Sequence, residues 1–256
     1  MGGSRLEIRK MNENDYVIFD PKIPKHKPRL TKLLIILISV MFIVELFYTA
    51  KYGEKGIIIL GAKWNEGITR GEYWRFLSCV FLHGNILHLF VNITALYIFG
   101  REVESIFGSF RFLILFLYSS WGASLTSYIF SPGISIGASG ALFGIIGGLI
   151  IFFFRQRENV SGAILRFKSM YTLVAINLLF GFLVPRIDNS AHIGGLITGL
   201  FTSLFISPEY EIKKDDLQEV LYVKRNKNIT KLCFGIFLTG AILFYLSKTA
   251  IGLLQK

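Results

Sequence analysis

Long apolar runs separated by short polar segments dominate the pattern of the chain. Seven such runs contain no Lys, Arg or Asp residue, and they cover residues 33–50, 85–100, 112–130, 135–154, 170–184, 189–206 and 232–247. A membrane-spanning helix needs about 20 mostly apolar residues, and neighbouring helices allow somewhat shorter ones. The pattern therefore predicts an all-α polytopic membrane protein with seven membrane-spanning helices.

The composition agrees with this prediction. Of the 256 residues, 52% are hydrophobic and 18% are charged, and the mean hydropathy is +0.53. In typical soluble domains, about a quarter of the residues are charged. The chain is therefore predicted to be an integral, multi-pass membrane protein.

The polar segments suggest a division of the chain. Residues 1–32 are polar and contain three prolines, and residues 207–231 are charged. Neither segment has enough apolar residues to form a soluble domain of its own. We predict a cytoplasmic tail at 1–32, a six-helix core at 33–206, a cytoplasmic connector at 207–231 and an additional C-terminal helix at 232–256.

The net charge of +11 could indicate binding to nucleic acid, but the distribution of the charge favours another explanation. With the N-terminus in the cytoplasm, 20 of the 28 Lys and Arg residues lie in cytoplasmic segments and eight lie outside. Cytoplasmic loops of membrane proteins carry such a basic excess. The charge therefore predicts a cytoplasmic N-terminus, contact with the anionic inner leaflet of the lipid bilayer, and no nucleic-acid partner.

Two polar residues begin neighbouring apolar runs on the same side of the predicted membrane. Ser139 follows the turn at 131–133, and His192 follows the polar segment at 185–188. Both runs enter from the outside in this topology, so the two side chains are expected at a similar depth. Polar and ionisable residues at membrane depth usually have a function, because burying them there is costly.

His88 and Asn92 form a second polar pair. They are four residues apart, so on a helix both point from one face. Gly84-Asn85 is a plausible helix cap, and a helix starting there places His88 in the first turn, near the depth of Ser139. The preceding segment, 52–82, contains Trp64, Tyr73 and Trp74 and is expected to be a structured, partly embedded loop. His83, just before this helix, is expected to tie the loop to the helix start.

Small residues give both candidate helices room to approach. Glycines 137, 140 and 144 surround Ser139, and glycines 194, 195 and 199 follow His192. Small residues allow membrane helices to pack closely. Such packing is needed if the serine hydroxyl and the imidazole are to form a hydrogen bond.

These residue types suit acyl transfer. A serine hydroxyl becomes a good nucleophile when an imidazole accepts its proton, so His192 could activate Ser139. The backbone N–H of Ser139 and the side chains of His88 and Asn92 could stabilise the oxyanion. Asp188 lies at the mouth of its helix and Glu45 lies on another segment, so a Ser-His dyad is predicted rather than a triad.

Together these motifs resemble the rhomboid family of intramembrane serine proteases. The resemblance covers about 33–206 and rests on four elements in order: Trp74-Arg75; His83, His88 and Asn92; Gly137-Ala138-Ser139-Gly140; and Ala191-His192 with Gly195 and Gly199. It implies that Ser139 is the nucleophile, His192 its partner, and His88 and Asn92 oxyanion residues. His83, Gly137, Gly140, Phe143 and Gly195 are implied as supporting residues, although some members carry a tyrosine in place of Phe143.

The resemblance also implies a fold, a partner class and a location. It implies a rhomboid-like six-helix bundle with one extra C-terminal helix, as in bacterial six-plus-one members, in the plasma membrane. The implied substrates are transmembrane proteins that enter sideways between helices. Neither a metal nor a nucleotide cofactor is implied, and the oligomeric state stays open.

Two other functions fit parts of the pattern. A transporter could use the same histidines, but it should carry polar residues through the full membrane depth and often has repeated halves. A catalytically inactive rhomboid-like protein that binds client helices is the nearer alternative. Alone, Ser139 could serve helix packing and His192 could be a satisfied structural histidine, so the catalytic interpretation depends on their occurrence with His88 and Asn92.

Overall fold

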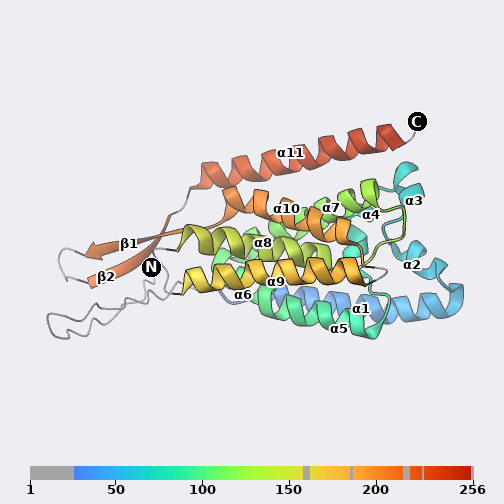
Figure 1. Cartoon of the computed structure of the whole chain (residues 1–256), viewed down its shortest axis with the longest axis horizontal. Coiled ribbons are helices and arrows are strands. Elements are labelled where there is room, and N and C mark those ends of the chain that lie inside the picture. Colours follow the sequence, from blue (N-terminus) through green and yellow to red (C-terminus); the bar gives the residue numbers. More distant parts are fainter. Residues whose placement is uncertain (1–25, 158–161, 185–186, 216–219, 227, 255–256) are drawn as a thin grey trace.

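The computed structural model describes residues 26–157, 162–184, 187–215, 220–226 and 228–254. The predicted tail at 1–32 therefore lies largely outside the described residues. Long helices run roughly parallel to one axis (Figure 1), and they are α1 (Arg29–Tyr52), α5 (Ile86–Ala95), α6 (Arg101–Phe107), α7 (Ser109–Phe130), α8 (Ser139–Arg155), α9 (Ala163–Leu183), α10 (Asn189–Ile206) and α11 (Ile229–Leu254). One π-helical turn, η2 (Leu96–Gly100), joins α5 to α6 into a continuous span. The chain is an all-α polytopic membrane protein.

Each predicted apolar run overlaps one of these helices. Among the described residues, five spans are long and apolar enough to cross a membrane, whereas α8 has only 17 residues and α10, with 18 residues, is not one of the five. Five of the seven predicted membrane-spanning helices therefore meet this criterion. α8 begins at Ser139, four residues later than the predicted run, because Ser135 pairs with Lys63 in an antiparallel bridge. Gly137 then has a φ of 118°, which a helix does not accept. The segment before Ser139 is therefore a loop rather than the first turn of a helix.

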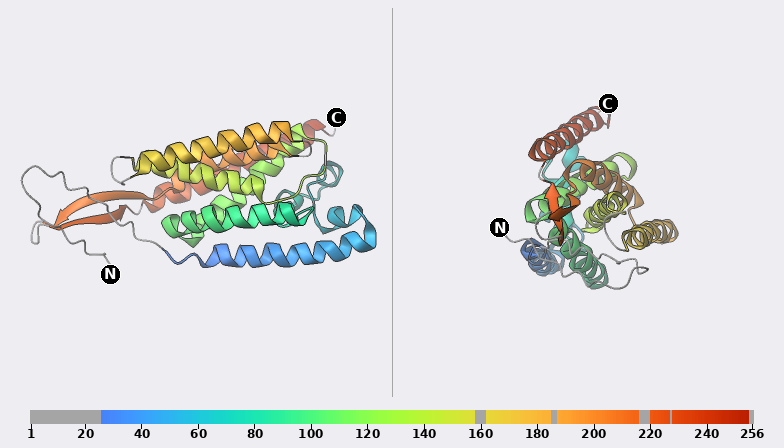
Figure 2. Two further views of the ribbon diagram at one scale, coloured as in Figure 1. Left: turned by 60° about the horizontal axis from the view of Figure 1, so that its bottom comes forward. Right: turned by 90° about the vertical axis from the view of Figure 1, so that its left-hand side faces the viewer.

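The helices differ in how deeply they lie within the bundle. In the most apolar window of each helix, 61% of residues are buried in α7 but only 11% in α9 and 17% in α11. α10 packs mainly against α7 and α8. Figure 2 shows α9 and α11 on the periphery of the bundle in the end-on view. The helices that carry Ser139 and His192 are thus interior ones, surrounded by helices with exposed apolar faces.

Close packing of α8 and α10 depends on glycine. A Cβ placed on Gly195 would overlap the carbonyl oxygen of Gly140, and one on Gly199 would overlap that of Gly144. Small residues permit this backbone-to-backbone approach in membrane proteins. The predicted glycine spacing is therefore used between these two helices.

The loop between α1 and α5 contains four short helices: α2 (Lys55–Leu60), α3 (Asn65–Thr69), α4 (Arg75–Ser78) and η1 (Cys79–Phe81). The buried Arg75 guanidinium donates hydrogen bonds to the carbonyl oxygens of Ile58 and Ala62, at 2.6 and 3.0 Å, and pairs with Glu72. A guanidinium with several acceptors stabilises irregular backbone that would otherwise have unpaired carbonyls. The expectation of a structured loop is confirmed.

The connector at 207–231 differs from its prediction. It contains an antiparallel hairpin of β1 (Glu209–Asp215) and β2 (Val220–Asn226), which extends from one end of the bundle in Figure 1. Both strands contain β-branched or aromatic residues among the charged ones, a composition compatible with strands. The high charge of the segment concealed this strand pattern in the sequence.

Candidate active site

Ser139 occupies the first position of α8, at the end of the bundle where the loops 53–85 and 131–138 lie and where α10 begins. We call this the loop end (Figure 1). The first intrahelical hydrogen bond of α8 runs from the N–H of Leu142 to the carbonyl of Ala138, at 3.0 Å. The N–H groups of the preceding residues therefore have no acceptor within the helix, as at every helix start. Ser139 is thus half-buried and lies beside backbone N–H groups that can bind an oxyanion.

His192 lies in the first turn of α10. Asp188 caps this helix, because its carboxylate accepts a hydrogen bond from the N–H of Ala191 at 3.0 Å. The Nε2 atom of His192 lies 2.8 Å from the hydroxyl oxygen of Ser139. The structure therefore brings together two residues that are 53 positions apart in the sequence.

One face of the His192 ring and its Nδ1 edge have different surroundings from Nε2. The ring of Phe143 stacks on it with centroids 4.4 Å apart and an interplanar angle of 13°. The Nδ1 atom is buried, and no group among the described residues hydrogen-bonds to it. Asp188 is engaged with Ala191 and Ser127 instead. This arrangement is that of a serine-histidine pair without an acidic third member.

His88 and Asn92 lie on α5, which begins where its sequence indicated. Asn85 caps this helix by accepting a hydrogen bond from the N–H of His88 at 2.8 Å. A Cβ on Gly137 would come within 2.7 Å of the His88 ring, so the ring packs directly against the loop that leads to Ser139. The Asn92 amide donates to the carbonyl of His88 at 2.8 Å, which leaves its second N–H for another acceptor.

His83 connects three parts of the molecule. Its backbone N–H donates to the Glu45 carboxylate of α1 at 2.7 Å, and its Nε2 atom accepts from the N–H of Ala138 at 3.4 Å. Burial, together with the nearby His88, lowers the pKa of His83 to about 3, so its imidazole is neutral and can accept this bond. His83 therefore links the loop both to α1 and to the residue before Ser139.

Sequence reasoning left two residues near this site without a function. Glu45 stood out as a carboxylate on an apolar helix, but its partner, the backbone of His83, was not foreseeable. Lys63 was not singled out at all, although it directly follows the apolar stretch 57–62. A lysine in such surroundings was the available signal, because a buried ammonium needs specific partners.

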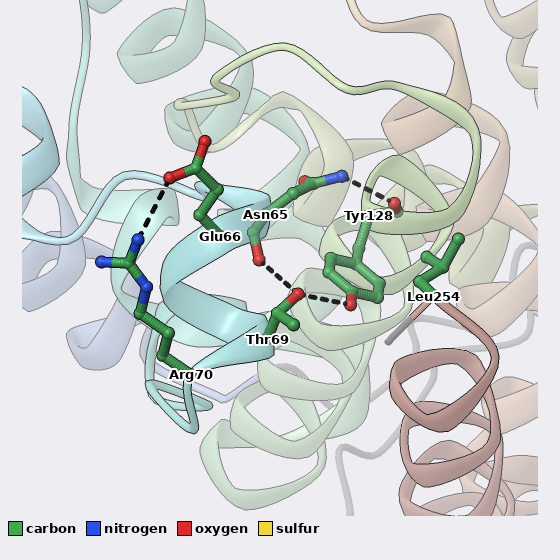
Figure 3. Close-up of a pocket in the computed structure, with 6 residues that line it drawn as sticks. All are labelled: Asn65, Glu66, Thr69, Arg70, Tyr128 and Leu254. Carbon is green, nitrogen blue, oxygen red and sulfur yellow. Dashed lines mark hydrogen bonds and ion pairs between the residues drawn. The ribbon is translucent and has the colours of Figure 1, made fainter. Parts of the chain in front are cut away.

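A separate pocket of about 430 Å³ lies at the loop end, between α3, α7 and the end of α11 (Figure 3). The polar groups lining it are bound to one another: Asn65 donates to the carbonyl of Tyr128 at 3.0 Å, and Thr69 contacts the Tyr128 hydroxyl at 3.0 Å. Arg70 pairs with Glu66 on its exposed rim. This pocket lies where the loop between α1 and α5 meets the C-terminal helix α11, and none of the candidate catalytic residues lines it.

Comparisons with known proteins agree on one family. Residues 70–209 match the family model of the Rhomboid domain, a range that includes every candidate site residue. The chain is 40% identical to Rhomboid protease GluP of Bacillus subtilis (strain 168) over 177 residues, which are 69% of this chain and 34% of that protein. It is 38% identical to RHOMBOID-like protein 5 of Arabidopsis thaliana over 59% of this chain and 50% of that protein.

A further relative bears on activity. The chain is 34% identical to Inactive RHOMBOID-like protein 8 of Arabidopsis thaliana over 54% of this chain and 39% of that protein. The chain spans between about a third and a half of the length of the curated relatives named here. Similarity of sequence therefore extends to one relative described as a protease and to one described as inactive, and the site itself must support the choice between them.

Proposed function

The chain belongs to the rhomboid family, and on this premise we propose that it is an intramembrane serine protease. It hydrolyses peptide bonds in or near the membrane-spanning segments of other membrane proteins. The observation that carries this proposal is the 2.8 Å distance between the Ser139 hydroxyl and Nε2 of His192. A nucleophile and a base at hydrogen-bond distance are the minimum requirement for acyl transfer by serine.

The proposed reaction begins at Ser139. With the ring proton of His192 on Nδ1, Nε2 accepts the hydroxyl proton while the serine oxygen attacks the substrate carbonyl carbon. The C–N bond then breaks, and His192 gives the proton to the leaving amine. In the second half, His192 removes a proton from water, the resulting hydroxide attacks the acyl-serine, and the proton returns to the Ser139 oxygen as the new carboxyl group leaves.

Oxyanion stabilisation has several candidate donors. The Ser139 backbone N–H lies at the start of α8, the His88 ring packs against Gly137, and Asn92 has one N–H beyond its bond to His88. Removing one such donor from an oxyanion site typically costs a factor of about 100 to 1,000 in kcat. We assign His88 and Asn92 to this role. His83, Gly137, Gly140, Phe143 and Gly195 are assigned to supporting the site as a whole.

The predicted domain division and topology complete the proposal. The core at 33–206 performs catalysis, the N-terminus is cytoplasmic, and the loop end faces the opposite side of the membrane. Ser139 and His192 are half-exposed, so water and a substrate backbone can reach them from the loop end. A bacterial plasma membrane would fit the similarity to GluP.

The test is cleavage of a single-span reporter substrate in liposomes by the wild type, Ser139→Ala and His192→Ala. Ser169→Ala, on the exposed surface of α9, is the matched serine control. We expect Ser139→Ala and His192→Ala to lose cleavage while keeping the wild-type unfolding midpoint, and Ser169→Ala to cleave normally. Cleavage by folded Ser139→Ala would refute the proposal.

The alternative is a rhomboid-like protein that binds client helices without cutting them, as the similarity to Inactive RHOMBOID-like protein 8 suggests. Crosslinking to several reporter substrates without cleavage by the wild type would favour this alternative. A small fluorophosphonate probe separates the cases further, because an inactive site should not become phosphonylated at Ser139, a reaction in which the serine oxygen displaces fluoride from phosphorus.

A further inference from the structure

Lys63 binds the loop that leads to Ser139. It lies between α2 and α3 and is fully buried. Its Nζ atom donates hydrogen bonds to the carbonyl oxygens of Ser131 and Gly133, each at 2.7 Å. Its backbone N–H and carbonyl pair with those of Ser135 at 3.0 and 3.1 Å. One residue thus supplies four hydrogen bonds to the loop between α7 and α8.

The loop has little freedom between Lys63 and the nucleophile. After Ser135, the N–H of Gly137 donates to the carbonyl of Cys79 at 2.9 Å, and the N–H of Ala138 donates to His83. Ser139 follows directly. A shift of the loop at Ser135 would therefore be transmitted to the hydroxyl and the N–H of Ser139.

The charge of Lys63 also acts toward the helix that carries His192. Lys63 interacts electrostatically with Asp188, whose carboxylate caps α10 by binding the N–H of Ala191. Asp188 also accepts a hydrogen bond from Ser127 near the end of α7. The ammonium group is thus bound to the loop that precedes Ser139 and attracts the carboxylate that caps the helix of His192.

A buried ammonium is costly unless it is well bound, and a nonpolar side chain could fill the same space without that cost. We propose that Lys63 is a positioning residue for the reaction, which places Ser139 relative to His192 through the 131–135 loop and Asp188. This proposal rests on the proposed function. Lys63 touches neither the substrate nor the reacting atoms, so its effect is on geometry.

The variants Lys63→Met and Lys63→Gln test this role. Met keeps an unbranched chain without donors, and Gln keeps a shorter polar group. Lys55→Met, at an exposed position of the adjacent α2, is the matched control. The rate of Ser139 phosphonylation by a fluorophosphonate probe, and kcat and KM for a single-span reporter, are measured in the full-length protein. All measurements are made at an equal interval below each variant's own unfolding midpoint, so that lower stability alone does not change the rates.

We expect Lys63→Met to reduce both the phosphonylation rate and kcat by about tenfold or more, because misplacing reacting groups by about 1 Å can cost about 100-fold in rate. KM should remain within about twofold, Lys63→Gln should lie between Met and wild type, and Lys55→Met should match wild type. Wild-type rates in a folded Lys63→Met or Lys63→Gln would overturn the proposal. Failure of both variants to fold would assign Lys63 to stability alone and would also overturn it.

The wild type separates this proposal from the one on which it rests. If the wild type is neither phosphonylated at Ser139 by the probe nor able to cleave the reporter, the proposed function fails and the positioning role fails with it. If the wild type is active and the Lys63 variants are equally active, only the role of Lys63 is refuted.

Discussion

Gly195 of α10 lies so close to Gly140 of α8 that a Cβ on Gly195 would overlap the Gly140 carbonyl oxygen. The carbonyl belongs to the residue after Ser139, and Gly195 lies three residues after His192. The contact between these glycines therefore sets how closely the two helices approach at the depth of the serine and the histidine.

Gly195→Ala should separate the helices and lengthen the Ser139–His192 contact. Overpacking of a close contact typically costs about 1–3 kcal/mol of stability, and a misplacement of about 1 Å in an active site can cost about 100-fold in rate. We expect a large loss of Ser139 phosphonylation by the fluorophosphonate probe and a lower unfolding midpoint. Gly252→Ala on α11, where a Cβ meets nothing within 4 Å, is the control and should change neither. Normal phosphonylation of Gly195→Ala would show that this contact does not set the catalytic distance.

Phe143 should matter through its ring. It stacks on His192 and is buried, so Phe143→Leu removes the face that orients the imidazole, whereas Phe143→Tyr retains it. Aromatic pairs contribute about 0.5–1.5 kcal/mol, which corresponds to a loss of about two- to twelvefold in kcat for Phe143→Leu. Steady-state cleavage kinetics measure this, with the exposed Phe182→Leu of α9 as control. Equal kcat values for Phe143→Leu and wild type would contradict a role in orienting His192.

Glu45 should stabilise the protein through the N–H of His83. Glu45→Leu leaves this buried donor without its acceptor, which costs about 1–3 kcal/mol, whereas Glu45→Gln keeps an oxygen in place. We expect the unfolding midpoint and the rate of Ser139 phosphonylation by the fluorophosphonate probe to fall in Glu45→Leu and to be largely retained in Glu45→Gln. Phe47→Leu, at a highly exposed position of the same helix, is the control. A Glu45→Leu variant as stable as the wild type would exclude the hydrogen bond as a significant contribution.

Lys63 should make stability depend on pH in a definite direction. Burial lowers its pKa from 10.5 to about 8, while the nearby Asp188 carboxylate and the Cys79 thiol act in the opposite direction. Between these values the unfolded chain binds more protons at this lysine than the folded protein does. The contribution of Lys63 to the free energy of unfolding should therefore rise with pH from about 8 to about 10.5.

Thermal unfolding in detergent at several pH values measures this contribution as the difference between the wild type and Lys63→Met. The same difference for Lys55→Met is the control for general effects of pH. A Lys63 contribution that stays constant or falls across this interval would contradict a lowered pKa.

Much of the fold was predictable because its signals are local. The seven apolar runs overlap observed helices, and five of them overlap spans that are long and apolar enough to cross a membrane. α10 begins and ends at the predicted residues. The Asn85 cap could also be read locally, since a cap is a relationship among residues three positions apart. The late start of α8 was missed, because it depends on the pairing of Ser135 with Lys63, 72 positions away.

By itself, the sequence determined that the chain is a polytopic membrane protein and that Ser139, His192, His88 and Asn92 begin or lie near the starts of apolar segments. Periodic hydropathy and helix capping are short-range properties, so they are visible along the chain. Only the tertiary structure decided that Ser139 and His192 lie at hydrogen-bond distance, that Glu45 binds the backbone of His83, and that the Lys63 ammonium binds the loop before the serine. These contacts join residues 38 to 68 positions apart, and they form only when the close packing of small residues sets the distances between helices.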